Sequence, residues 1–273
     1  MLLLPSGPTT AFNIREILSM GHNAPSTAGD VPADLARLWR LPTSARRGRP
    51  AELDVERVVG AAVDLADHEG LDGVTLQKVA QTLGFTKMSL YRHVGSKEEL
   101  VELMADHATG SAPRLDADGW RDGVHRWAAA IRTRYAEHPW LVEVPIAGPP
   151  RGPNAIGWMD TFLRVLHDTG LDPRTKAGIL VVVSGYVRNA ILQSRQMAAG
   201  RSGTGLSQSD VEQNYGLALA ALVHPERFPE AAPLFAAGAF ESEPGEDPEE
   251  QDFVFGLNLI LDGVEAAIAR GTR

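Results

Sequence analysis

Four basic side chains fall in a stretch of the chain that contains no carboxylate. Lys78, Lys87, Arg92 and Lys97 lie between Gly73 and Lys97, although Asp and Glu make up 35 of the 273 residues. A surface that meets phosphates must lack carboxylates, because each one would repel the polyanion. The charge pattern therefore predicts a nucleic-acid contact surface. An amphipathic helical hairpin whose basic face is only solvated would show the same pattern, and this alternative stays open here.

Two short helices joined by a tight turn would position these side chains. Apolar residues recur at helical spacing before Gly84, where a left-handed residue can end a helix: Val74, Leu76, Val79, Ala80 and Leu83. Thr86 is placed to cap a second helix. The pair predicts a helix-turn-helix with residues 87–93 as recognition helix. A helix from Asp54 to about His68 precedes it, and the capping box of Ser96 and Glu99 begins the next helix.

The residues from about Arg46 to Gly110, through RGRP and LYRHVGSKEEL, resemble the DNA-binding domain of the TetR-type bacterial repressors. The resemblance implies that the recognition helix enters the major groove and reads base edges with Lys87, Met88 and Ser89. The resemblance also implies a second set of residues that contact the DNA backbone or lie exposed on the DNA-facing side: Thr75, Gln77, Tyr91, Arg92, His93 and Lys97. The tetracycline repressor has arginine where this chain has Gln77, so the base preference there should differ.

A basic cluster precedes the first helix of this domain. Arg46, Arg47 and Arg49 can form an arm that follows phosphates or enters the minor groove, and a solvated tail is an equal alternative. Residues 1–45 are rich in Pro, Gly, Ser and Thr and predict a flexible extension, with a short helix allowed around Ala33–Leu41. The domains expected are thus the extension 1–45, the helix-turn-helix domain 46–110 and a second domain 111–273.

Composition limits the class of protein. The net charge of −9 does not exclude a DNA partner, since the acids concentrate elsewhere, notably in residues 241–250, and screening limits their reach to roughly 10 Å. The absence of cysteine excludes disulfides and thiolate metal sites. The first residues lack a basic n-region, and no apolar run approaches the roughly 20 residues of a membrane span. We expect a cytoplasmic protein without a membrane partner.

The second domain predicts an all-α architecture. Helices are expected over about 120–137, 154–168, 173–199, 208–223 and 252–270. The third and last of these are apolar over more than one face, which favours burial against another subunit. The closing FVFGLNLILDGVEAAI resembles the end of the tetracycline-repressor-like C-terminal domain, and this resemblance implies a homodimer with a four-helix interface.

Aromatic and polar side chains of the second domain suggest a small-molecule pocket, although each taken singly fits a plain core or interface role equally well. The predicted lining consists of Trp127, Ile131, Tyr135, Trp158, Met159, Phe162, Tyr186, Asn189 and Gln193. The tetracycline repressor's drug-contacting Asn and Phe correspond roughly to Trp127 and Ile131, and its magnesium-binding His falls near residues 144–145. Tetracycline with magnesium is therefore a poor guess for the ligand, and no cofactor or metal is expected.

These observations predict a ligand-responsive transcriptional regulator and favour a repressor. A homodimer would bind a double-stranded operator of inverted-repeat form, and a small-molecule effector would release it by tilting the helix over residues 96–109. Two alternatives stay open: a constitutive DNA-binding protein without ligand control, and a helical enzyme. The enzyme is disfavoured because the sequence lacks paired Glu-x-x-His motifs, a P-loop and a nucleophile motif.

Overall fold

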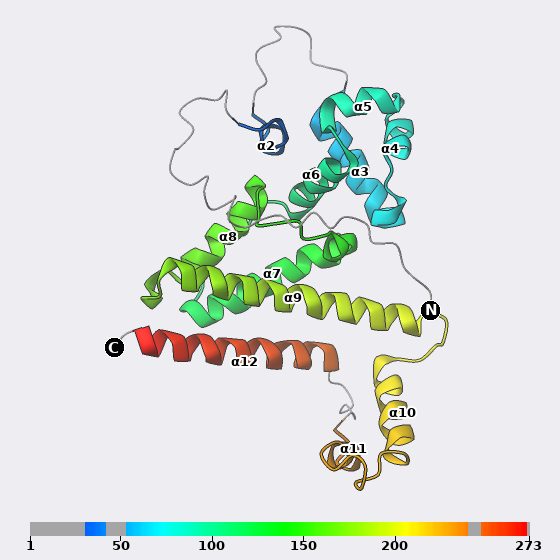
Figure 1. Cartoon of the computed structure of the whole chain (residues 1–273), viewed down its shortest axis with the longest axis vertical. Coiled ribbons are helices and arrows are strands. Elements are labelled where there is room, and N and C mark those ends of the chain that lie inside the picture. The colour runs from blue at the N-terminus through cyan, green and yellow to red at the C-terminus, as the bar shows by residue number, and fades with distance from the viewer. Residues whose placement is uncertain (1–30, 42–52, 240–246, 272–273) are drawn as a thin grey trace, which may run out of the picture.

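The computed structural model of the chain describes residues 31–41, 53–239 and 247–271, and helices are the regular elements of these residues, with no strand among them (Figure 1). The α-helices are α2 (Ala33–Leu38), α3 (Val55–Glu69), α4 (Leu76–Leu83), α5 (Lys87–Val94), α6 (Lys97–Thr109), α7 (Trp120–Glu137), α8 (Pro153–Val165), α9 (Pro173–Arg201), α10 (Gln208–Ala220), α11 (Ala232–Ala236) and α12 (Pro248–Gly271). Three short 3-10 helices are η1 (Leu71–Gly73), η2 (Pro139–Glu143) and η3 (His167–Thr169). The all-α prediction is confirmed.

Helices α3 to α6 form a small unit, called the headpiece below, around one apolar core. Val58 and Val59 of α3, Leu90 of α5 and Leu100 of α6 are fully buried in this core. Local capping explains where the helices begin and end. Asp54 Oδ1 accepts a hydrogen bond from the Arg57 amide at 2.8 Å and starts α3, as the sequence predicts.

The extension expected to be flexible over residues 1–45 contains a packed helix. Leu38 of α2 is only 2% exposed and belongs to the headpiece core. The apolar spacing allowed a short helix here, but nothing in the sequence pattern indicated that it would bury a side chain in another unit. The expectation of flexibility is therefore wrong for residues 31–41, because burial of Leu38 anchors them. Residues 1–30 and 42–45 lie outside the described residues.

Helices α7, α8, α9 and α12 form a second unit, called the body, with a core of its own that includes Trp127, Phe162, Val183 and Leu257. Helices α9 and α12 run side by side along one edge of the molecule (Figure 1). A Cβ at Gly256 would lie 2.3 Å from the Tyr186 hydroxyl, so only glycine allows this close approach. That hydroxyl donates to the carbonyl of Phe253 at 2.9 Å and so ties the two helices together.

The outer faces of α9 and α12 expose apolar side chains. Val181 is 69% and Phe255 is 66% exposed, and Val182 and Leu259 are also exposed. Helix α9 is long and apolar enough to cross a membrane, by length and composition alone. A single helix of this kind is weak evidence for a membrane span, because a helix that packs against a second subunit has the same composition. Helices α10 and α11 pack on each other, at the end of the molecule away from the headpiece (Figure 1).

The headpiece and the body share part of their cores through η2. Trp140 and Leu141 are buried in the headpiece core although they follow α7 of the body. The Trp140 indole nitrogen donates to Asp67 Oδ1 of α3 at 2.7 Å, and Asp67 also contacts the His138 ring at 2.9 Å. These contacts form a direct mechanical link between the two units.

Candidate nucleic-acid interface and ligand pocket

The recognition helix α5 is held in place by buried apolar side chains on one face and by the turn that joins it to α4. Leu90 and Val94 are fully buried, and they hold one face of α5 against the headpiece core. Gly84 ends α4 with φ 75° and ψ 23°, the left-handed conformation that glycine adopts without strain. Thr86 Oγ1 then accepts from the Ser89 amide and starts α5. The predicted helix-turn-helix geometry is present.

The opposite face of α5 projects predicted contact residues into solvent. Met88 is 72% and Tyr91 is 38% exposed, and Lys87 and Arg92 are exposed beside them. Lys87 Nζ lies 5.7 Å from the centre of the Tyr91 ring, so the ammonium and the aromatic face form one surface. Thr75, Gln77 and Lys97 are also exposed, whereas Ser89 and His93 are half-buried. Arg46, Arg47 and Arg49 lie outside the described residues.

Not every cation of the carboxylate-free stretch is available to a polyanion. Lys78 Nζ lies 2.5 Å from Glu69 Oε2, a carboxylate that reaches the stretch from the end of α3. Lys87, Arg92 and Lys97 form no ion pair with any residue in the described part of the chain. The hydroxyl of Thr75 accepts from the Lys78 amide at 3.2 Å as the cap of α4, and its own proton remains available to donate to a phosphate.

The capping box predicted at the start of α6 is only half formed. Ser96 Oγ accepts from the Glu99 amide at 3.1 Å as expected. The Glu99 carboxylate does not return to the Ser96 amide, because Arg37 of α2 holds both of its oxygens. A residue 62 positions earlier in the chain thus takes the place of the local partner, and sequence spacing could not reveal it.

Four of the predicted pocket residues form a solid core instead of a cavity wall. The Trp127 ring meets Trp158 and Phe162 edge-on, at 5.9 and 5.0 Å between ring centres. Both indoles have buried partners: Trp127 donates to the Trp158 carbonyl, and Trp158 donates to the Gly110 carbonyl. Ile131 completes this cluster. The plain core reading left open above describes these residues.

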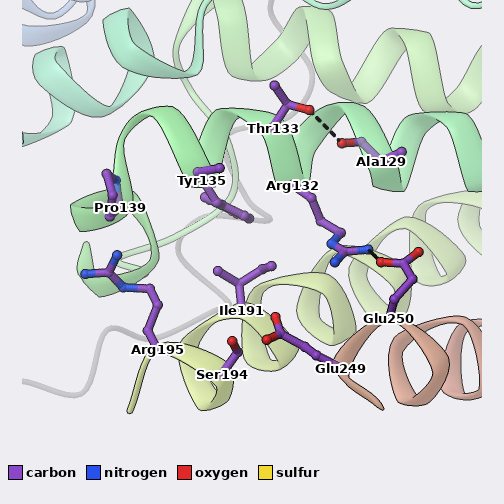
Figure 2. A pocket seen from close by; sticks show the side chains of 11 residues that line it. Ala129, Arg132, Thr133, Tyr135, Pro139, Ile191, Ser194, Arg195, Glu249 and Glu250 are labelled. Atoms are coloured by element: carbon purple, nitrogen blue, oxygen red, sulfur yellow. Dashed lines mark hydrogen bonds and ion pairs between the residues drawn. The ribbon is translucent and has the colours of Figure 1, made fainter. Parts of the chain in front are cut away.

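A pocket of about 590 Å³ lies between α7, α9 and the start of α12 (Figure 2). It is lined by Ala129, Arg132, Thr133, Tyr135, Ala136, Pro139, Ile191, Ser194, Arg195, Glu249 and Glu250. Tyr135 is the one predicted lining residue among them. Asn189 and Gln193 are exposed and do not line it, and neither do Met159 and Tyr186.

Charged groups give this pocket its polarity. Arg132 Nη1 donates to Glu250 Oε2 at 2.6 Å (Figure 2). The Arg132 guanidinium also lies 4.1 Å from the centre of the Phe253 ring. A neighbouring hollow of about 270 Å³ shares Arg132 and Glu250. Burial raises the pKa of Tyr135, so its hydroxyl stays protonated near neutral pH. Aromatic composition does not indicate the arginines and glutamates of this pocket, although Ala129, Arg132, Thr133 and Ala136 share one helical face.

Comparison with known proteins supplies the family. The protein-family model described as "Bacterial regulatory proteins, tetR family" matches residues 58–104. The family model described as "Tetracyclin repressor-like, C-terminal domain" matches residues 112–268. The chain is 32% identical over 253 residues to the HTH-type transcriptional repressor DrrR1 of Streptomyces coeruleorubidus, covering 92% of this chain and 91% of that protein. The chain belongs to the TetR family of bacterial regulators.

Other TetR-family proteins resemble about four fifths of the chain. The tetracycline repressor protein class E of Escherichia coli is 26% identical over 223 residues, covering 80% of this chain and 93% of that protein. Apo ActR of Streptomyces coelicolor aligns with a TM-score of 0.66 and 25% identity over 81% of this chain and 99% of its own. ActR in complex with actinorhodin aligns with a TM-score of 0.64 and 24% identity over 79% of this chain and 98% of its own, which concerns the fold alone. This TetR-family chain is a DNA-binding transcriptional regulator and not an enzyme.

Proposed function

We propose that the protein is a cytoplasmic, ligand-responsive repressor that binds an inverted-repeat operator as a homodimer and leaves it when a small molecule binds the body. The observation that carries the DNA part is the outer face of α5, where Lys87, Met88 and Tyr91 are exposed together without a paired carboxylate. Lys87 donates to guanine and Met88 packs on a thymine methyl group in this proposal, and Tyr91 contacts the backbone.

The outer faces of α9 and α12 support a homodimer. Val181 and Phe255 are two-thirds exposed in the single chain, and a soluble monomer rarely leaves a continuous apolar face on two adjacent helices. Gly178 and Gly185 lie on the same face of α9 with open space where a Cβ would point. Two copies packed through these faces would form a four-helix interface with two-fold symmetry.

The pocket between α7, α9 and α12 supports the ligand part. Its volume of about 590 Å³ falls in the range of small-molecule sites, and its apolar walls carry a few charged groups that can orient a ligand. ActR has the same fold and has been seen in complex with actinorhodin. We infer that the effector is an organic molecule that occupies this pocket, without a metal ion.

A ligand in this pocket would act directly on the link between body and headpiece. Pro139, which lines the pocket, is the first residue of η2, and Trp140 follows it into the headpiece core. Arg188 of α9 holds η2 from the other side by donating to the carbonyls of Val142 and Val144, at 2.8 and 2.6 Å. Displacement of η2 would move α3 and α6 and change the separation of the two recognition helices.

Selection of DNA from a random duplex library by the purified protein tests the proposal. The expected outcome is enrichment of an inverted repeat, whose half-sites are about one helical turn apart. In the Met88→Ala variant, the base preference should relax at one position of each half-site and stay unchanged elsewhere. Met197→Ala of α9 is the matched control and should keep the wild-type base preference. If no common sequence is enriched, the proposal that the protein binds a specific operator is refuted. A compound library screened for a raised melting temperature would then identify the effector, and absence of ligand control would leave a constitutive repressor.

A further inference from the structure

Helix α2 reaches the junction between the recognition helix and α6. Arg37 donates through Nε and Nη2 to the two carboxylate oxygens of Glu99, the latter at 2.8 Å. The Glu99 side chain is 12% exposed and that of Arg37 is 27% exposed, so water screens this pair only partly. Leu38, the next residue, is buried in the headpiece core and fixes α2 in place.

The ion pair lies directly on the turn that joins α5 to α6. A Cβ placed on Gly95, the first of the two residues between these helices, would lie 2.2 Å from Glu99 Oε2 and 3.0 Å from Arg37 Nη2. Gly95 also has φ 63°, a backbone conformation that favours glycine. The guanidinium of α2 and the carboxylate of α6 therefore contact the backbone immediately after the recognition helix.

Helix α2 also contacts the body. Arg151, in the loop before α8, donates to Asp34 of α2 at 3.0 Å and to Glu102 of α6 at 2.5 Å. The Trp39 indole nitrogen, just after α2, donates to the Arg151 carbonyl at 2.8 Å. Arg40 extends the same contacts to Glu56 of α3. One short helix thus connects α3, α6 and the loop before α8.

We infer that α2 is a brace that positions the recognition helix relative to the body, and that Arg37 and Glu99 are the positioning residues of the DNA contact. This inference rests on the proposed DNA interface only for its effect on binding. Without the brace, the headpiece would be held by α6, η2 and its covalent connection alone. A looser headpiece must lose more freedom when two recognition helices dock at a fixed separation, so operator affinity falls.

Two variants with the same change of charge separate positioning from simple electrostatics. Glu99→Gln weakens the contact with Arg37, and Glu98→Gln removes a neighbouring carboxylate that contacts Ser96 and Lys97 instead of Arg37. Both remove one negative charge near the phosphates, so electrostatics alone predicts equal or tighter binding for both. The brace predicts that Glu99→Gln binds the selected operator about fivefold more weakly than the wild type, whereas Glu98→Gln binds it as tightly as the wild type or more tightly. Equal affinities of the two variants would overturn the inference.

A distance measurement tests the brace without DNA. The sequence has no cysteine, so spin labels attached to Gln81→Cys in α4 and His167→Cys in η3 report on one headpiece and one body when the labelled chain is diluted with unlabelled chain. Glu99→Gln and Arg37→Ala should each broaden the distance distribution, and Glu98→Gln should leave it as in the wild type. Unchanged widths in the first two variants would overturn the brace. Broadening in a protein that binds no duplex would uphold the brace and refute the proposed function.

Discussion

Single side chains of α5 divide cleanly into those that hold the helix and those that face solvent. Leu90 and Val94 are fully buried and attach α5 to the core. Met88 of the same helix is 72% exposed, which is unusual for an apolar side chain. A side chain that contributes little to packing can be changed without loss of the fold. Substitutions on this face are therefore informative about binding alone.

Replacement of Tyr91 by alanine should lower operator affinity about tenfold, equivalent to about 1.4 kcal/mol, while the melting temperature stays nearly unchanged. The physical reason is that the exposed ring, with Lys87 Nζ 5.7 Å from its centre, lies outside the core and in the proposed complex contacts the DNA backbone. A gel-shift titration and a thermal unfolding curve measure the two effects. Tyr215→Ala, an exposed tyrosine of α10, is the control and should keep operator affinity. Equal affinities of all three proteins would refute the role of Tyr91.

Asp106 of α6 should make the stability of the protein depend on pH. Burial raises the pKa of this carboxyl, although Oδ1 accepts from the Ala155 amide at 3.0 Å at the start of α8. A folded-state pKa above the unfolded one means that the folded state takes up its proton first, so this contribution stabilises at low pH and is lost as pH rises. Urea unfolding of wild type and Asp106→Asn should show a difference in unfolding free energy, wild type minus variant, that grows as the pH is lowered from 7 towards the unfolded-state pKa of about 4. A constant difference would contradict the assignment.

Whole helices were predictable where local rules decide their ends. The helix predicted over 120–137 matches α7, and Asp54, Gly84 and Thr86 begin or end helices by contacts within a few residues. Contacts between distant segments were not predictable in this way. The burial of Leu38, the Arg37–Glu99 pair and the link of Trp140 to Asp67 each join residues far apart in the chain, and no spacing in the sequence encodes them.

The same limit explains the pocket. An aromatic cluster such as Trp127, Trp158 and Phe162 has the composition of a ligand site and of a core, and only packing distinguishes them. The real lining combines α7, α9 and the first turn of α12. Glu249 and Glu250 are separated from Arg132 by more than a hundred residues, so their meeting depends on how α12 docks against α9.

The paired faces of α9 and α12 should fail as an interface when one apolar side chain becomes charged. Val181→Glu would bury an unpaired carboxylate between two subunits, at a cost of several kcal/mol per ion. Sedimentation should therefore show monomers for this variant at concentrations where the wild type is a dimer, with operator affinity reduced more than about a hundredfold. Leu234→Glu places the same charge on exposed α11 and should leave the dimer intact. A wild type that sediments as a monomer would contradict the interface.

At the scale of the whole molecule, an acidic protein presents a local basic surface. The net charge is −9, yet the outer face of α5 and the start of α6 carry Lys87, Arg92 and Lys97, none of which forms an ion pair within 4.0 Å in the described residues. Screening over roughly 10 Å separates this face from acids elsewhere in the chain. In the proposed complex, an acidic protein therefore meets DNA through this face.

Salt dependence of duplex binding tests the central claim most directly. Wild-type protein is titrated into a labelled duplex of the selected sequence, and anisotropy is followed at 50 to 200 mM salt. The predicted result is saturable binding of two chains per duplex. Affinity should fall by about 10³ over this range, because Lys87, Arg92 and Lys97 of two copies together displace about six counterions. Absence of saturable binding at 50 mM salt, or an affinity that salt does not change, would contradict the account.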